Sequence, residues 1–391
     1  MEKSSGTVFD YLRWRGDLSF AQDPFNEVDN LILCIICYLN FRRFRTLRSK
    51  DPAKAVKMGD VCRRMTKKDE QLGLSWHDYI PLMEQAAQTR RFADTALFAF
   101  TYENDTKKEM QFEAISFLLP DNSVFVSYMG TDTSLVGWKE NFNMSYLQTV
   151  PAQKRAAEYA TEIARACPNR ILRLGGHSKG GNLAAWAAIH LPEDIRDRQL
   201  ADAYNNDGPG FQKGLLNTEA YQTVAKKIHT YVPESSIVGV LLEHAEDYAV
   251  IDSSNRAVLQ HEPLSWQVEG NHFVHLGQRS QLGQLSDGVL QEWIGSMSAK
   301  ERREFTDALF GILGADSKIR TLDDLHSGGL TGRTALLRGY INADEKKKKI
   351  IAEVLHRLAV DVGDELKRAA EDELKSMKKV ARHTLSNRKK A

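Results

Sequence analysis

Apolar, aromatic and β-branched positions cluster in short runs through the middle of the chain. Charged or Pro/Asn/Asp-rich turns separate the first three runs, which predict an antiparallel start to a sheet: residues 96–102, 111–118 and 123–128. Three later runs each follow a helical or linking segment, the spacing expected of βαβ units: residues 170–174, 200–204 and 227–232. Residues 247–251 and 256–260 are expected to form a late hairpin, which residues 266–273 continue. The pattern predicts an α/β fold with a mostly parallel sheet flanked by helices.

Both ends of the chain show helical patterns instead. The first 90 or so residues include an amphipathic stretch over residues 27–41, and another helix is expected over residues 152–166. A capping box at residues 298–301 begins a later helix, and apolar residues recur at near-helical spacing from 346 to about 379. We therefore expect two parts, an α/β domain over residues 1–280, which includes the N-terminal helices, and a helical C-terminal extension over residues 281–391.

Composition and charge exclude several classes of protein. Hydrophobic residues make up 42% and charged residues 27%, as in ordinary soluble domains, and a net charge of +1 gives no signal for nucleic acid. The start lacks the pattern of a secretion signal, and the longest apolar stretch, residues 31–39, is far shorter than the roughly 20 residues of a membrane span. We expect a cytoplasmic protein. The basic run at residues 346–349 and the basic C-terminal helix are consistent with peripheral membrane contact, although a solvated helix face explains them as well.

Two of the four cysteines have the spacing of a redox or zinc motif. Cys34 and Cys37 lie inside the apolar stretch of residues 31–39, and no second pair of ligands is nearby. They are expected to be buried apolar side chains. We expect neither a metal nor an organic cofactor.

The motif Gly-His-Ser-Lys-Gly at residues 176–180 has the pattern Gly-x-Ser-x-Gly, with a predicted strand before it and a predicted helix over residues 183–189 after it. A serine on such a strand-to-helix turn projects its hydroxyl from the carboxyl edge of a sheet. Glycines on both sides allow the strand and the helix to approach closely. Ser178 is therefore a candidate nucleophile, with a phosphate-binding loop as the alternative.

A nucleophilic serine needs a base, and the base needs an acid. Where such a serine follows a strand of a parallel sheet, the acid and then the histidine come after it in the sequence. Asp207 directly follows the next strand after Ser178 and is the first candidate for the acid, with Glu234 after the following strand as the alternative. His261 is the first candidate for the base, and His272 is the alternative. Two other histidines compete for the same role: His244 and His275. His177 is expected to shape the turn.

An oxyanion hole needs backbone amides aimed at the charge that develops on the substrate. The Lys179 amide, next to the nucleophile, is expected to provide one, and the Thr131 amide the other, because Gly130 permits close approach. The apolar segment at residues 135–139 is either a lid or a packed connector. The Lys179 side chain suggests a preference for anionic or polar substrates.

The motifs around Ser178 and Thr131 resemble those of known hydrolase families. Residues 128–132, Gly137-Trp138 and residues 176–184 resemble the oxyanion and elbow arrangement of fungal-type (class 3) lipases. Over roughly residues 7–280 the chain is similar to an uncharacterised bacterial family of Mbeg-like α/β-hydrolases, with landmarks at residues 25–29, 238–239 and 261–266. The turn at residues 207–211 is also similar to the acid-bearing turn of pancreatic-type lipases.

The resemblance implies an α/β-hydrolase-like fold and a Ser-His-Asp triad that cleaves carboxylic esters of small molecules or lipids through an acyl-enzyme. Class 3 lipases usually carry Arg where this chain has Met129, and they take the acid from the later strand, where this chain has Glu234. Two alternatives remain open, an acyltransferase or thioesterase with the same triad and a non-catalytic module of hydrolase fold that binds a membrane or a partner.

Overall fold

The computed structural model describes residues 5–69, 79–132, 134–236, 238–280, 296–313, 321 and 343–353. Within these residues, nine strands form one sheet, in the order β1-β2-β3-β4-β5-β6-β7-β8-β11. Their bounds are β1 (Val56–Lys57), β2 (Ala96–Asp105), β3 (Met110–Leu118), β4 (Ser123–Tyr128), β5 (Ile171–His177), β6 (Leu200–Asn206), β7 (Ile228–Pro233), β8 (Tyr248–Ile251) and β11 (His275–Leu276). A separate pair, β9 (Val268–Glu269) and β10 (His272–Phe273), is antiparallel.

Strands β4 to β8 form a parallel centre, and the outer strands on both sides pair antiparallel. Helices link the parallel strands and cover the sheet, so the fold is α/β-hydrolase-like, as the sequence predicts. The predicted hairpin at residues 247–260 is wrong in its second half. Residues 257–261 form a 3-10 turn, η6 (Ala257–His261), and β8 pairs antiparallel with β11 instead.

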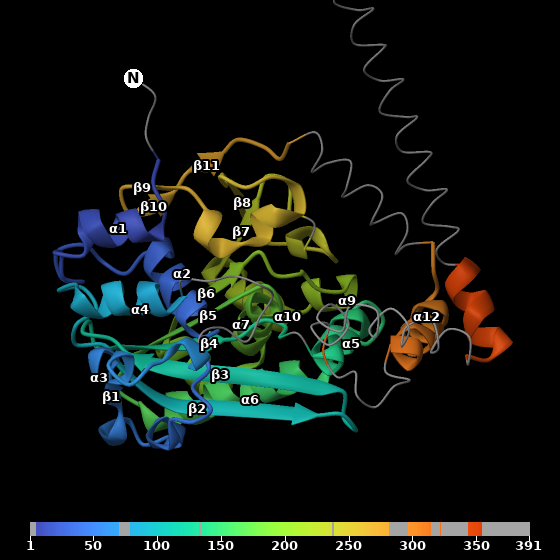
Figure 1. Ribbon diagram of the computed structural model, residues 1–391, viewed down its shortest axis with the longest axis horizontal. Coiled ribbons are helices and arrows are strands. Elements are labelled where there is room, and N and C mark those ends of the chain that lie inside the picture. Colours follow the sequence, from blue (N-terminus) through green and yellow to red (C-terminus); the bar gives the residue numbers. More distant parts are fainter. Residues whose placement is uncertain are drawn as a thin grey trace, which may run out of the picture.

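Helices pack on both faces of the sheet (Figure 1). On one face lie α1 (Val8–Arg15), α2 (Glu27–Ile36) and α4 (Tyr79–Gln88), and on the other lie α6 (Pro151–Ala166) and α7 (Lys179–His190). Side chains of one strand alternate between the two faces, so Phe125 of β4 joins the core beneath α2 while Val124 and Val126 join the core beneath α7. The sheet is thus buried on both sides around the elbow.

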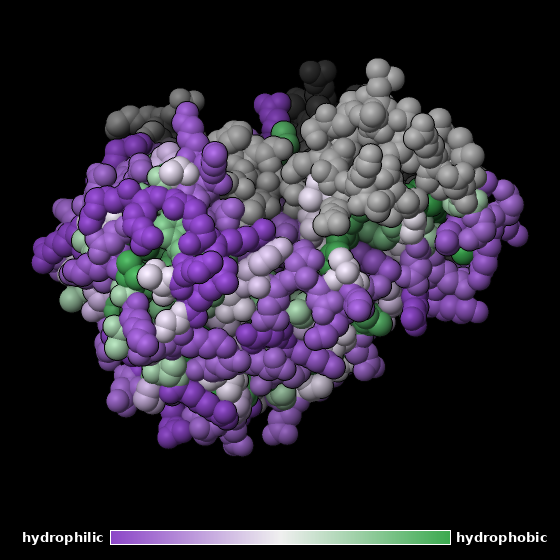
Figure 2. Space-filling model, turned by 60° about the horizontal axis from the view of Figure 1, so that its bottom comes forward, coloured by the Kyte–Doolittle hydropathy of each residue, from purple (hydrophilic) through white to green (hydrophobic). Residues whose placement is uncertain are grey.

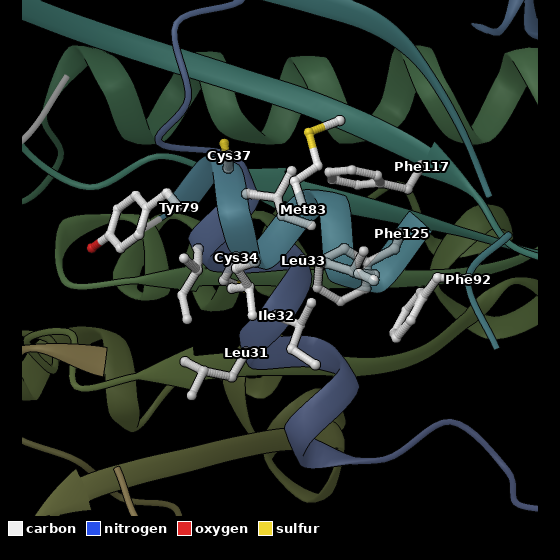
Figure 3. Close-up of a cluster of buried hydrophobic side chains, with 14 of the residues drawn as sticks. Leu31, Ile32, Leu33, Cys34, Cys37, Tyr79, Met83, Phe92, Phe117 and Phe125 are labelled. Atoms are coloured by element: carbon white, nitrogen blue, oxygen red, sulfur yellow. The ribbon is translucent and has the colours of Figure 1, made fainter. Parts of the chain in front are cut away.

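Helix α2, which the sequence predicted to be amphipathic, is instead buried from Val28 to Ile36 because it lies between the sheet and other helices. Figure 3 shows its Leu31, Leu33 and Cys34 among side chains of α4 and of the sheet, including Met83 and Phe125. All four cysteines of the chain are buried and free, as predicted for Cys34 and Cys37.

A buried ion pair fixes the start of α2. The Asn26 side chain accepts from the Val28 and Asp29 amides, while Asp29 accepts from the Asn26 amide at 3.0 Å. The Arg91 guanidinium lies against the same carboxylate, with Nε at 2.6 Å from Asp29 Oδ1, and neither side chain is exposed. Tyr11 of α1 donates to Asp29 Oδ1 at 2.8 Å, so this carboxylate ties α1, α2 and the segment before β2 together.

Helix α12 (Ala299–Leu313) packs beside α5 (Leu135–Asn143), the helix that follows the predicted oxyanion loop (Figure 1). Phe142 of α5 contacts Phe305 and Phe310 of α12, with ring centroids 6.4 and 5.6 Å apart. The capping box predicted at residues 298–301 forms at the start of α12. Residues 345–353 are helical, and the rest of the long amphipathic helix predicted to residue 379 lies outside the described residues.

Hydrophilic side chains cover most of the described surface on the face in Figure 2, where hydrophobic residues are visible in small separate groups. No helix within the described ranges is both long and apolar enough to cross a membrane.

Candidate active site

Ser178 lies at a sharp turn between β5 and α7 and has backbone angles of φ 60° and ψ −134°. A positive φ is rare for a residue with a side chain and marks strain that the surrounding structure must hold in place. Two hydrogen bonds do so, from the Ser178 amide to the Asn206 carbonyl at 2.9 Å and from the Gly181 amide to the Ser178 carbonyl at 2.9 Å. This is the geometry of a nucleophile elbow.

The glycines around Ser178 are required by close packing. A Cβ on Gly176 would lie 2.2 Å from the Gly180 backbone, and a Cβ on Gly180 would lie 2.1 Å from the Tyr128 carbonyl oxygen. Real Cβ atoms do not approach other atoms so closely, so β5, α7 and the end of β4 meet at a distance that only glycine permits. The crowding predicted from the sequence is present.

Asp207 and His261 form a hydrogen-bonded pair near the elbow. Asp207 follows β6 directly, its side chain is fully buried, and its Oδ2 lies 2.6 Å from His261 Nδ1. A carboxylate only accepts, so Nδ1 carries the proton in the neutral imidazole and Nε2 is left as the basic nitrogen. A Cβ on Gly208 would lie 2.3 Å from the Ser178 carbonyl, which shows how closely the acid-bearing turn packs on the elbow.

The segment after β7 contributes a hydroxyl group to the Asp207–His261 pair and not a second carboxylate. Ser236, which follows β7, donates to Asp207 Oδ2 at 2.6 Å. Gly239 lies against the other carboxylate oxygen, where a Cβ would come within 2.2 Å of Asp207 Oδ1. This role of Ser236 could not be predicted from the sequence, because its partner lies 29 residues away.

His177 fixes the turn that carries His261. Its Nε2 lies 2.8 Å from the His261 carbonyl and therefore donates, and its Nδ1 accepts from the Tyr38 hydroxyl at 3.1 Å. Trp266 packs edge-on against the same ring. Burial, together with the nearby His261, holds the pKa of His177 well below its usual value, so the imidazole is neutral. His177 thus supports the turn that carries His261 as well as its own turn.

Two backbone amides next to Ser178 are available for an oxyanion. The Gly130–Thr131 loop lies against the elbow, since a Cβ on Gly130 would be 3.1 Å from Ser178 Cβ. Neither the Thr131 amide nor the Lys179 amide donates to any other described residue. The Lys179 amide also begins α7, where the helix dipole favours negative charge.

The Lys179 side chain does not face a substrate, contrary to the expectation from the sequence. It is 1% exposed and points into the protein, where Nζ lies 2.8 Å from the Gln111 carbonyl and 3.1 Å from Glu140 Oε2. A preference for anionic substrates therefore has no basis in this ammonium group.

The alternative acid and base make other contacts. The hydrogen bonds of Glu234 to other described residues run through its backbone. His272 is exposed on β10, and its Nδ1 lies 2.7 Å from the Phe273 carbonyl. His244 pairs with Glu246 at 2.9 Å and His275 with Glu27 at 2.9 Å. Only His261, of the candidate bases, lies within hydrogen-bond distance of Asp207 in the described structure.

One further titratable side chain lies beside the pair. Burial raises the pKa of Glu262, the residue after His261, to about 7. Its Oε1 accepts from the Leu264 amide at 3.0 Å and so caps the short helix η7 (Pro263–Ser265). Over the described ranges, no group of three or more His, Cys, Asp or Glu side chains is arranged to hold a metal ion.

The fold is α/β-hydrolase-like, because five parallel strands form its centre and the strained Ser178 lies at their carboxyl edge. The buried Asp207 and its partner His261 lie beside that edge. The chain belongs to the Mbeg1-like family, whose model matches residues 86–311. The resemblance was expected over roughly residues 7–280, so the matched stretch begins later, ends later and extends into α12.

Solved lipase structures show a distant likeness. A Rhizomucor miehei lipase in complex with its propeptide is 13% identical over 54% of this chain and 78% of its own, with a TM-score of 0.36. A lipase from Yarrowia lipolytica is 12% identical over 63% of this chain and 91% of its own, with a TM-score of 0.35. Lipase II from Rhizopus niveus is 15% identical over 43% of this chain and 69% of its own, with a TM-score of 0.30. The chain matches none of the curated proteins with which it was compared.

Proposed function

We propose that this protein is a serine hydrolase that cleaves carboxylic esters, with Ser178 as nucleophile, His261 as base and Asp207 as the acid that orients the base. The observation that carries the proposal is the 2.6 Å contact between the buried Asp207 carboxylate and His261 Nδ1, close to a serine whose backbone is held at φ 60°. A serine hydroxyl is a weak nucleophile without such a base, and the base needs a fixed tautomer.

In the first half of the reaction, Ser178 Oγ attacks the ester carbonyl carbon while its proton passes to His261 Nε2. The carbonyl π electrons move to the oxygen, and the amides of Thr131 and Lys179 stabilise the resulting oxyanion. The tetrahedral intermediate then collapses, the bond to the alcohol oxygen breaks, and the leaving alkoxide takes the proton from His261. Asp207 stabilises the imidazolium throughout.

In the second half, water attacks the acyl-enzyme carbonyl and gives its proton to His261. Collapse of this intermediate releases the carboxylic acid, and the proton returns to Ser178. The substrates that fit this chemistry are esters of small molecules or of lipids. No step requires a metal or an organic cofactor.

The test is fluorophosphonate labelling of the full chain, read by intact mass and peptide mapping, together with turnover of p-nitrophenyl esters of increasing acyl length. We expect one label per chain, on Ser178, and a Ser178→Ala protein that neither labels nor turns over. Ester turnover that survives in purified, folded Ser178→Ala would refute the assignment. An acceptor alcohol or thiol that outcompetes water would indicate an acyltransferase, and a folded protein inert to both probes would indicate a binding module.

A further inference from the structure

A buried side-chain network lies directly behind the predicted oxyanion loop. Lys179 Nζ contacts three oxygen atoms, the Gln111 carbonyl at 2.8 Å, Glu140 Oε2 at 3.1 Å and Gln111 Oε1. An ammonium group has three donors, so these contacts use all of them. The ion pair with Glu140 is fully enclosed, since the two side chains are 1% and 0% exposed. A buried charge is tolerated only with such complete pairing.

The network fixes which way the Gln111 side-chain amide faces. Lys179 can only donate, so the atom of Gln111 that contacts it must be the oxygen Oε1. The nitrogen Nε2 therefore faces the other way and donates to the Gly130 carbonyl at 3.4 Å. This hydrogen bond is long, but the amide orientation that it requires is set independently by the lysine.

The Gly130 carbonyl belongs to the peptide unit whose N–H is that of Thr131. Every peptide bond in the described structure is trans, and in a trans unit the C=O and the N–H point in opposite directions. A carbonyl held toward Gln111 therefore directs the Thr131 N–H away from Gln111. Gly130 itself lies against the elbow, where an added Cβ would come within 3.1 Å of Ser178 Cβ. Asn141 of α5 also donates to Thr131 Oγ1 at 2.6 Å and anchors the residue from its side chain.

Glu140 anchors the whole arrangement on α5. Its Oε1 accepts from the backbone amide of Ala152 at 2.9 Å. Its Oε2 accepts from the backbone amide of Gln111 at 3.1 Å and also from Lys179. Gly137, one turn earlier on α5, packs so closely that an added Cβ would lie 3.1 Å from both Gln111 Oε1 and Thr131 Cγ2. Residues 135–139, which the sequence predicted as a lid or a packed connector, are thus packed in place.

We propose that Gln111 and Lys179 are positioning residues that orient the Gly130–Thr131 peptide, so that the Thr131 N–H stabilises the oxyanion of the acyl-transfer reaction. The inference rests on the proposed function. Gln111 does not touch the substrate, and Lys179 acts here through its side chain, separately from its backbone amide. The network orients the Thr131 N–H before the substrate binds, and a donor that is already oriented needs no rearrangement during the reaction.

The test is a Gln111→Met variant of the full chain. Methionine has a similar size but neither donates to Gly130 nor accepts from Lys179. Removal of one oxyanion donor typically lowers kcat by about 10²–10³-fold. Here the donor is misdirected rather than removed, so we expect kcat for a p-nitrophenyl ester to fall by roughly 10- to 100-fold, with KM within about 2-fold. A trifluoromethyl ketone, whose serine adduct is a tetrahedral oxyanion, should lose affinity in parallel.

Gln153→Met is the matched control. Gln153 is also buried, and it donates to Asn182 Oδ1 at 2.9 Å and accepts from the Val150 amide at 3.0 Å, but neither of these hydrogen bonds involves the Gly130–Thr131 loop. We expect this variant to lose thermal stability while kcat stays within about 2-fold of wild type. If Gln111→Met does not fold, Gln111→Glu replaces it, since the carboxylate still accepts from Lys179 but cannot donate to Gly130.

Different outcomes distinguish the two proposals. Wild-type turnover that depends on Ser178, with an unchanged kcat in the folded Gln111 variant, would overturn the positioning role and leave the hydrolase proposal intact. Equal losses of kcat in the Gln111 and Gln153 variants would also overturn it, since general loosening would explain both. Absence of Ser178-dependent turnover in the wild type would overturn both proposals.

Discussion

The ring of His177 lies against the ring of His261, with the centroids 4.5 Å apart and the planes tilted by 33°, while His177 Nε2 donates to the His261 carbonyl at 2.8 Å. The residue before Ser178 thus supports the turn that carries His261, through both its ring and its hydrogen bond. A shift of either segment changes the contact with the other. In the neutral ring that the lowered pKa of His177 favours, Nε2 carries the proton donated to His261 and Nδ1 can accept from Tyr38.

The stability of the protein should therefore depend on pH through His177. Burial lowers the pKa of His177 well below 6.5, so the unfolded chain binds a proton near that pH that the folded chain does not. The stabilising contribution is complete above pH 6.5 and is lost as the pH falls. Between about pH 7.5 and about pH 5.5, the free energy of unfolding should fall by about 1 kcal/mol more in wild type than in His177→Gln.

Urea unfolding of both proteins at the two pH values measures this difference, and the other titrating groups cancel in it. Equal pH dependence in the two proteins would mean that His177 titrates normally in the folded state.

The acid of the proposed triad can be tested by exchanging carboxylates for amides. Asp207→Asn removes the charge that stabilises the imidazolium and the acceptor that fixes its tautomer. We expect kcat for ester hydrolysis to fall by roughly 10³–10⁴-fold while the far-UV circular dichroism stays unchanged. Glu234→Gln should retain kcat within about 2-fold, because its backbone alone bonds to other described residues. The reverse pattern would transfer the acid role to Glu234.

The buried pair between Arg91 and Asp29 should dominate the stability of the N-terminal region. Arg91→Leu leaves the Asp29 carboxylate buried with no counter-charge, and such a loss typically costs about 3–5 kcal/mol. Arg13→Leu is the control, since Arg13 pairs with Asp10 at the surface and its side chain is 60% exposed, so the expected cost is below about 1 kcal/mol. Similar unfolding free energies of the two variants in urea would contradict this ranking.

The contact between α5 and α12 should be visible in hydrogen exchange. Phe142→Ala removes the ring that packs against Phe305 and Phe310, so we expect faster exchange over residues 299–313 and unchanged exchange in β4 to β7. Ile171→Ala, at an exposed side chain at the start of β5, should leave α12 unchanged. Unchanged protection of α12 in Phe142→Ala would mean that other contacts hold this helix.

The strands of the sheet could be predicted from the sequence because long apolar runs favour one structure locally. The segment at residues 256–260 could not, because its structure depends on distant polar partners. Gln260 Oε1 accepts from the Ser235 amide at 2.7 Å, and the Gln260 carbonyl accepts from Trp266 Nε1 at 2.9 Å. These contacts hold a 3-10 turn where propensity alone suggested a strand.

The elbow was predictable for a different reason, since a strained serine requires glycines at fixed offsets. The direction of the Lys179 side chain was not, because its partners Gln111 and Glu140 lie 68 and 39 residues away in the sequence. A lysine beside a nucleophile suggests contact with substrate until the buried acceptors behind it are known. Asp207 was proposed from strand order, because it directly follows the strand after Ser178, whereas His261 was proposed because a histidine follows the acid in the chain order of such triads. The structure brings the two side chains together.

Helix α2 lies outside the stretch that the family model matches, yet Asn30 of this helix donates to Asn206 beneath the elbow at 2.9 Å, and Tyr38 just beyond it reaches His177. A fragment cut at the limits of the match would expose the apolar face of the sheet and leave the turn around Ser178 without its backing. The stretch that the family model matches is therefore shorter than the part of the chain that must be expressed to keep the elbow supported. The ends of any shortened protein should be chosen from the packing contacts and not from the limits of the match.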